Sequence, residues 1–160
     1  MHLTLIKKKI MTAEIVTAKG TMKFDLYEKE TPITVQNFAK LAKSGFYDGV
    51  TFHRVLKGFV LQGGDPNTKE GAKGQPGAGG PGYSINCETS AEKQYHDRGV
   101  LSMAHRGKNT GGSQFFVCMT RDMTKHLDGV HTCFGKITAG EEIIDDVREG
   151  DIIEKIIIHD

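Results

Sequence analysis

Alternation of apolar and polar residues dominates the start of the chain. The run 22–27 places Met, Phe and Leu at every second position, and the run 14–18 precedes it across a Lys-Gly turn at 19–20. A period of two is typical of a half-buried strand, and a glycine-containing turn between two such runs is typical of a hairpin. The pattern therefore predicts two antiparallel strands with one buried face.

A helical period replaces the alternation after residue 30. Thr31 is a typical N-cap residue, Pro32 suits the first helical position, and apolar residues recur at helical spacing from Val35 to Ala42. Ser44 and the glycine after it end the pattern. The sequence predicts one amphipathic helix here.

Short apolar runs fill most of the remaining chain. Strand candidates lie within 46–64, 99–103, 114–119, 131–137 and 152–158. The Gly-rich stretch 71–82 is interpreted as a surface loop. A second, short helix is expected over 141–147, where two glutamates suit the positive end of a helix. Many strands with two helices predict a mainly β fold, a closed sheet with capped ends.

Residues 1–11 are interpreted as an N-terminal extension and residues 12–160 as one domain. The short apolar patch before Lys7 is too brief for a secretory signal, and no stretch approaches the roughly 20 apolar residues that span a bilayer. With 160 residues, 38% of them hydrophobic, the chain is long enough to bury one core. A cytoplasmic protein without a membrane partner is predicted.

Charge and cysteine content narrow the classes of partner and compartment. Charged residues make up 26% of the chain and leave a formal net charge of +1, so no global field recruits nucleic acid. The three cysteines, Cys87, Cys118 and Cys133, lie far apart and lack the Cys-x-x-Cys spacing of zinc and dithiol sites. They are interpreted as reduced and structural.

Three weak motifs are set aside. Residues 77–82 spell Gly-x-Gly-x-x-Gly, but Pro81 obstructs the helix that a dinucleotide site needs. The seven histidines include no His-x-x-x-His or His-Glu-x-x-His pair. Ser90-x-x-Lys93 lacks the companion motifs of the hydrolases that carry it. No metal and no cofactor are predicted.

Three further segments carry candidate chemistry, at 52–55, 58–65 and 109–116. In a strand, Phe52 and Arg54 would share one face, which places an aromatic ring beside a cation. Taken singly, each segment is better explained by a surface arginine beside core aromatics. Together they require a common explanation.

These segments resemble the cyclophilins, a family of prolyl isomerases. Phe-His-Arg-Val, Gly-Phe-Val-Leu-Gln-Gly-Gly-Asp, Leu-Ser-Met-Ala and Gly-Ser-Gln-Phe-Phe occur in the family's order and spacing, and the likeness runs from about Thr12 to Ile158. The resemblance implies a closed eight-stranded antiparallel β-barrel, capped by two α-helices, with a groove on its outer face. It also implies a monomeric, cofactor-independent isomerase that assists protein folding by acting on proline-containing peptides and on unfolded or flexible segments.

The resemblance implies a role for each groove residue. Arg54 would be the catalytic cation, a hydrogen-bond donor to the prolyl nitrogen. The residues implied to bind substrate are Phe59, Val60, Phe116, Leu127 and His131 around the proline ring, Gln62 and His105 on the peptide backbone, and Ala104, Gln114 and His126 along the groove.

Departures from the family pattern lie at the rim of the expected groove. Val60 stands where many relatives carry methionine, and it keeps the pocket apolar. His126 stands where the relatives that bind cyclosporin best carry tryptophan, so weakened cyclosporin binding is expected. Arg106 replaces a common alanine and, with Ala78 and Thr110, would line a second pocket. That cation predicts a preference for acidic residues upstream of proline.

Two other function classes compete with this hypothesis. The same groove could hold proline-containing segments as a binding module, with isomerisation incidental, and a metal or redox protein could be built on Cys and His. Arg54, Phe59, Gln62 and Phe116 are all intact. They favour an enzyme, because a pure binder does not need a charged donor at the rotating nitrogen.

Overall fold

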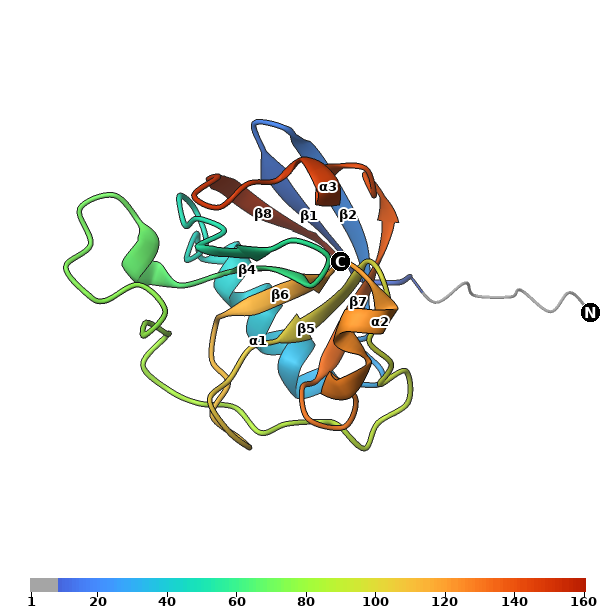
Figure 1. The fold of residues 1–160 in the computed structure, drawn as a ribbon. Coiled ribbons are helices and arrows are strands. Elements are labelled where there is room, and N and C mark those ends of the chain that lie inside the picture. Colours follow the sequence, from blue (N-terminus) through green and yellow to red (C-terminus); the bar gives the residue numbers. More distant parts are fainter. Residues whose placement is uncertain (1–8) are drawn as a thin grey trace, which may run out of the picture.

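An antiparallel sheet of eight strands forms the body of the protein in the computed structural model, which describes residues 9–160 (Figure 1). The predicted N-terminal extension, 1–11, lies for the most part outside this range. The strands are β1 Thr12–Thr17, β2 Gly20–Leu26, β3 Arg54–Leu56, β4 Val60–Gly63, β5 Val100–Met103, β6 Phe115–Cys118, β7 Cys133–Ala139 and β8 Ile153–His159. Each predicted strand region overlaps at least one of them.

The first hairpin shows how the pattern becomes structure. Strands β1 and β2 pair antiparallel with Ile15 opposite Met22, and both side chains are completely buried. Gly20 takes a φ of +135° at the turn, and a side chain there would collide with Ile143. The buried face predicted for this hairpin is confirmed.

The sheet is open, so the predicted closed barrel is wrong. Its strand order is β3-β4-β6-β5-β7-β2-β1-β8, and within residues 9–160 the edge strands β3 and β8 do not pair with each other. The segments just before them are linked by an isolated bridge between Thr51 and Ile152 and by backbone hydrogen bonds such as the one from the Ile153 amide to the Val50 carbonyl. On the free edge of β3, the amide of Val55 donates to the Glu149 carboxylate at 3.3 Å instead of to a strand. The Glu149 carboxylate thus pairs with a backbone amide that a neighbouring strand would otherwise bind.

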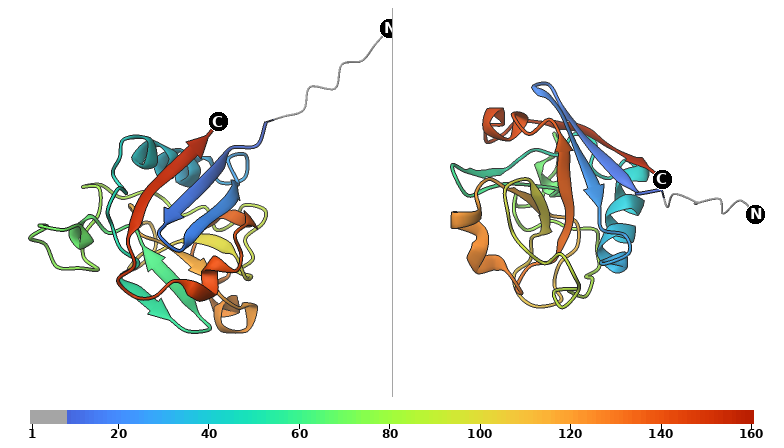
Figure 2. Two further views of the ribbon diagram at one scale, coloured as in Figure 1. Left: turned by 90° about the horizontal axis from the view of Figure 1, so that it is seen from above. Right: turned by 90° about the vertical axis from the view of Figure 1, so that its right-hand side faces the viewer.

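Only one of the two predicted capping helices is a full helix. Helix α1 spans Pro32–Lys43 and covers one end of the curled sheet (Figure 2). The helix expected over 141–147 is a single turn, α3 Ile143–Asp146, because Val147 already adopts an extended conformation. Another single turn, α2 Arg121–Thr124, was not predicted.

The N-terminus of α1 is capped from a distance. Pro32 occupies the first turn as predicted, but the Thr31 hydroxyl donates to the Tyr27 carbonyl and caps no helical amide. The Glu88 carboxylate accepts from the Thr34 amide at 2.7 Å instead. An anion is favourable there because the unpaired amides of a helix N-terminus carry partial positive charge. This contact also ties the long β4–β5 connection to α1.

Two separate apolar clusters pack against the sheet. The larger fills the inside of the curl with rings such as Phe38, Phe115 and Phe134. The smaller, around Val60 and Phe116, lies on the outer side. All three cysteines are free; two are buried, and Cys87 is partly exposed. Between residues 9 and 160 no helix is long and apolar enough to cross a membrane.

Candidate active site

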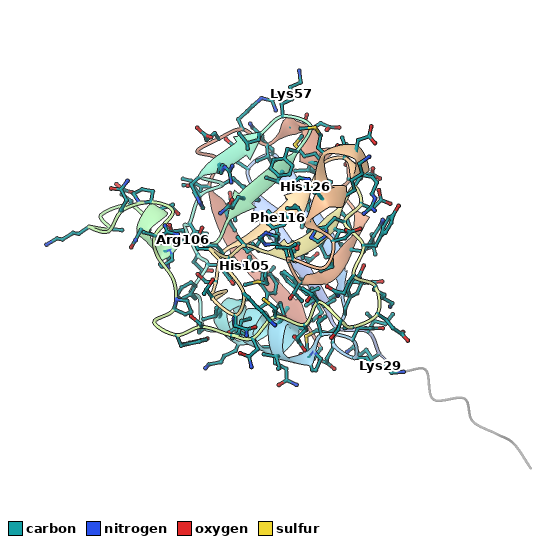
Figure 3. The ribbon with its side chains drawn as sticks, turned by 60° about the horizontal axis from the view of Figure 1, so that its bottom comes forward. Lys29, Lys57, His105, Arg106, Phe116 and His126 are labelled. Carbon is teal, nitrogen blue, oxygen red and sulfur yellow. The ribbon has the colours of Figure 1, made fainter. Side chains whose placement is uncertain are left out.

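The outer face of the sheet holds a cavity of about 610 Å³ beneath the long β4–β5 connection. Of the residues predicted for the groove and the second pocket, the structure brings together Arg54, Phe59, Val60, Gln62, Ala78, Ala104, His105, Arg106, Thr110, Gln114, Phe116, Leu127 and His131. Figure 3 looks onto this face, with Phe116 between His126 on one side and His105 and Arg106 on the other.

Phe116 lies at the centre of the apolar part of the cavity. Alternation along β6 sends Phe115 into the interior and Phe116 outward, where its ring is 4% exposed. The His131 ring stands edge-on to it, with centroids 5.5 Å apart and planes at 79°. With Val60 from β4, these rings form a small hydrophobic pocket open to water.

Arg54 projects beside this pocket and is oriented by a chain of amides. It pairs with Gln62 across β3 and β4, and its Nη1 donates to Gln62 Oε1 at 3.4 Å. Gln62 Nε2 donates to Gln114 Oε1 at 3.1 Å, and Gln114 Nε2 donates in turn to the carbonyls of Gly77 and Gly79. Within residues 9–160 the guanidinium makes no other hydrogen bond to protein, which leaves donors free for a ligand.

Phe52 does not lie beside Arg54, contrary to prediction. Strand β3 begins only at Arg54, so the expected alternation does not reach back to Phe52. Phe52 is completely buried in the interior cluster, whereas Arg54 is exposed in the cavity. The apolar partners of the cation come from β4 and β6 instead.

Apart from Ala78, the wall formed by the Gly-rich loop was not predicted from the sequence. The completely buried Asp65 carboxylate accepts hydrogen bonds from the amides of Asn67, Gly77 and Gly79, and a side chain at Gly79 would collide with it. The predicted loop thus folds back over the groove. Its additional lining residues are Gly77, Gly79, Gly80, Pro81 and Tyr83, joined by Gly112 and Ser113. The one local signal for this wall was Asp65, an acidic residue that directly follows two glycines at the end of a predicted strand region.

Two stacked histidines form the opposite side of the cavity. The rings of His105 and His131 lie 4.0 Å apart at 15°. His105 Nε2 donates to the Val130 carbonyl and its Nδ1 accepts from the Gly107 amide, while His131 Nδ1 donates to the Met103 carbonyl at 2.8 Å. Burial lowers the pKa of His131 to about 4, so its imidazole is neutral at pH 7.

His126 stands apart from the other predicted residues. Its ring stacks on Phe59 with centroids 5.8 Å apart, but it is exposed and does not line the cavity. It therefore extends the rim beyond Phe59.

Arg106 reaches across the second part of the cavity. Its Nη2 donates to the Gly77 carbonyl at 3.1 Å, and its backbone amide donates to Thr110 Oγ1 at 3.2 Å. Ala78 lines the same part of the cavity. Among the cavity-lining residues there are two arginines and no carboxylate.

Other site chemistries find little support in the geometry. Within residues 9–160, no group of three or more His, Cys, Asp or Glu side chains is arranged to hold a metal ion. The Gly-x-Gly-x-x-Gly segment at 77–82 leads into a loop, not a helix. The cavity combines an apolar pocket with the cations of Arg54 and Arg106, which suits an uncharged ring next to a polar backbone.

Known proteins resemble this chain in both sequence and fold. Residues 12–159 match the family described as "Cyclophilin type peptidyl-prolyl cis-trans isomerase/CLD". Peptidyl-prolyl cis-trans isomerase B of Bacillus subtilis is 50% identical over 135 residues, 84% of this chain and 88% of that protein. A peptidyl-prolyl cis-trans isomerase of Helicobacter pylori is 49% identical over 147 residues, 91% of this chain and 85% of its own.

Solved structures of the same family superpose on this chain. A cyclophilin type peptidyl-prolyl cis-trans isomerase of Cryptosporidium parvum superposes with a TM-score of 0.84 at 33% identity, covering 95% of this chain and 99% of its own. A second crystal structure of that enzyme, determined in the presence of the dipeptide Ala-Pro, superposes with a TM-score of 0.81 at 33% identity, covering 93% and 99%.

Proposed function

The chain belongs to the cyclophilin family and is a cofactor-independent peptidyl-prolyl cis-trans isomerase, and we propose that Arg54 is its catalytic residue. The single observation that carries this proposal is the position of Arg54: a cation with free donors beside the apolar pocket around Phe116. The relative crystallised with Ala-Pro supports a proline ring as the occupant of that pocket.

The proposed mechanism follows from the electronic structure of the amide. The nitrogen lone pair is shared with the carbonyl, which gives a rotation barrier of about 18 to 20 kcal/mol. As the bond twists, the lone pair localises on the prolyl nitrogen. A hydrogen bond from a donor aimed at that atom is therefore stronger in the transition state than in the ground state. Arg54 supplies this donor, and no proton transfer or covalent intermediate is needed.

The remaining groove residues would hold one side of the peptide while the other turns. Phe116 and its apolar neighbours receive the proline ring and exclude water. Gln62, oriented by Gln114, and the backbone at His105 hold the flanking peptide. An acceleration of about 10⁵-fold needs about 7 kcal/mol of differential stabilisation, which one charge-assisted hydrogen bond and positioning can supply.

Exchange spectroscopy on a short Xaa-Pro peptide tests the role of Arg54. Arg54→Ala is expected to lose most turnover and Arg54→Lys somewhat less, while both keep the fold. Lys57→Ala is the matched control, because Lys57 lies on the same β3–β4 hairpin but outside the cavity. Retained turnover in Arg54→Ala would refute the mechanism. Peptide binding without any wild-type turnover would indicate a binding module.

The pH dependence of wild-type turnover is a separate test. Guanidinium stays charged, so turnover is expected to be nearly flat between about pH 6 and 9.

We also propose that Arg106 selects acidic residues upstream of proline, in a second pocket with Ala78 and Thr110. The absence of carboxylates from the cavity lining supports this, because a lysine there would meet two arginines. Turnover of peptides that carry Glu or Lys before the Xaa-Pro bond is the test. Higher turnover of the Glu peptide, reduced by Arg106→Ala, is expected; equal turnover of both peptides contradicts the proposal.

We further propose that the clients are unfolded or flexible segments with accessible Xaa-Pro bonds, and that the enzyme assists their folding as a cytoplasmic monomer. Cyclosporin binding is weakened by His126, whose ring covers less apolar surface on Phe59 than an indole would. Calorimetric titration with cyclosporin is expected to give tighter binding to His126→Trp than to wild type.

A further inference from the structure

A closed polar network lies directly behind the floor of the proposed proline pocket. The His96 side chain is completely buried, and its ring lies nearly parallel to that of Phe116, with centroids 5.9 Å apart and planes at 16°. Phe116 therefore rests on a histidine on one side and faces the cavity on the other. A buried polar ring in this place needs partners for both nitrogens.

Both ring nitrogens of His96 have partners. Nδ1 lies 2.9 Å from Asp128 Oδ1 and Nε2 lies 2.7 Å from Ser102 Oγ. The second carboxylate oxygen of Asp128 accepts from Arg121 Nη1 at 2.7 Å. Arg121 also donates to the His96 carbonyl at 2.8 Å, so the network closes on itself.

The partners determine which nitrogen of His96 carries the proton. Desolvation opposes ionisation of Asp128, but hydrogen bonds from His96 and Arg121 outweigh it and hold the pKa of the carboxyl below its usual value. The carboxylate can only accept, so Nδ1 carries the hydrogen. Burial lowers the pKa of His96 despite Asp128, and the neighbouring Cys133 thiol stays protonated because burial raises its pKa to about 12. The Ser102 hydroxyl has one hydrogen for two acceptors, Nε2 at 2.7 Å and the Thr132 carbonyl at 3.2 Å, and with the hydrogen of His96 on Nδ1 the shorter contact makes Nε2 its acceptor.

Asp128 also holds the wall of the pocket. It directly follows Leu127, which lines the cavity at the end of the 3-10 turn η2 Lys125–Leu127. Its Oδ1 accepts from the His96 backbone amide at 2.8 Å as well as from the ring. One carboxylate thus anchors a wall residue, Leu127, and orients the ring under the floor residue, Phe116.

We propose that Asp128 and His96 are positioning residues of this isomerase, which fix the wall and the floor of the proline pocket relative to each other. The inference rests on the proposed function of that pocket. Although Asp128, His96 and Ser102 are connected like a hydrolase triad, Ser102 is completely buried, so no substrate reaches its hydroxyl. The network acts on the shape of the pocket and touches no substrate atom.

Steady-state kinetics of Asp128→Asn on an Xaa-Pro peptide test the proposal. A misplaced pocket weakens the binding of the ground state and of the transition state alike. KM is therefore expected to rise about tenfold while kcat stays within about twofold. Asp145→Asn is the matched control: Asp145 also bridges an arginine, Arg98, at 2.9 Å, but lies outside the cavity. It is expected to leave both constants unchanged.

Nitrogen NMR of the His96 ring gives a readout that a merely structural role would not change. Wild type is expected to show the neutral tautomer with hydrogen on Nδ1, and Asp128→Asn a shift toward the tautomer with hydrogen on Nε2. His96→Phe keeps a ring under Phe116 without its polar contacts and serves if Asp128→Asn does not fold; it too is expected to raise KM.

Two outcomes overturn the proposal. One is an Nε2–H tautomer in wild type; the other is KM within twofold of wild type in the folded variants. Phe116→Ala, measured alongside, separates this failure from that of the pocket. If Phe116→Ala raises KM and Asp128→Asn does not, only the positioning pair has failed. If Phe116→Ala leaves KM unchanged, the proposed proline pocket itself has failed.

Discussion

Phe115 and Phe116 are neighbours on β6 and are 0% and 4% exposed, yet they belong to different regions of the molecule. Phe115 meets the rings of Phe38 and Tyr47 edge-on in the interior. Phe116 meets His96 and His131, whose nitrogens are held by hydrogen bonds. Burial alone therefore does not separate core from site. The neighbouring side chains do: Phe115 packs in the interior apolar cluster, whereas Phe116, besides its apolar neighbours, contacts two histidine rings that are oriented by hydrogen bonds.

The largest expected effect separates these two rings directly. Phe115→Ala leaves a cavity in the closed interior and is expected to lower the free energy of unfolding by about 3 to 5 kcal/mol. Phe116→Ala is expected to cost about half as much, because water can enter its site from the groove. Urea unfolding of both variants is the measurement. Equal losses would break the comparison between core and groove.

A smaller effect is expected where the two regions touch. The buried Tyr47 hydroxyl donates to the carbonyl of Ser113, a groove-lining residue, at 2.9 Å. Tyr47→Phe leaves that carbonyl without its partner and is expected to lower stability by about 1 to 2 kcal/mol. KM for an Xaa-Pro peptide should change little. A large change in KM would show that the interior shapes the groove through this bond.

Acid is expected to lower the stability of the protein through His131, a residue of the groove. Its pKa is about 4 in the folded protein and 6.5 ordinarily, so between these values the unfolded chain binds the proton that the folded protein excludes. Titration of His131 therefore lowers the free energy of unfolding as pH falls from about 6.5 to 4. Above about pH 6.5 it makes no contribution to the pH dependence of stability. His131→Asn keeps a donor for Met103 but does not titrate. Urea unfolding across this range should show a steeper decline for wild type; parallel declines would contradict the assignment.

The smallest effect is expected at the surface, away from both regions. Lys43 and Asp160 form an ion pair at 2.7 Å, with side chains 50% and 63% exposed. Such pairs contribute little because water screens them. Lys43→Ala is expected to change neither KM nor melting temperature measurably. A clear loss of stability would mean that the chain end matters more to β8 than its exposure indicates.

Much of the site was predictable because short segments carry it. The strand regions and helix α1 follow from short apolar runs and helical period, and many of the residues that line the cavity follow from the resemblance of about 12–158 to one family. The separation of Phe52 from Arg54 was not predictable in the same way. Where a three-residue strand begins depends on its partner, and β3 pairs only with β4.

The sequence by itself determined the periodic elements, the family and the groove residues, because local spacing and motif identity need no knowledge of distant partners. Tertiary structure alone decided that the sheet stays open, that Glu88 caps α1 from 54 residues away, and that Asp65 folds a glycine loop over the groove. It also placed Asp128 against His96 across 32 residues. The contacts of Glu88, Asp65 and Asp128 are pairings of one polar group with another. Such pairings are set by how the chain packs, because the great majority of buried donors and acceptors find a partner wherever the fold brings one.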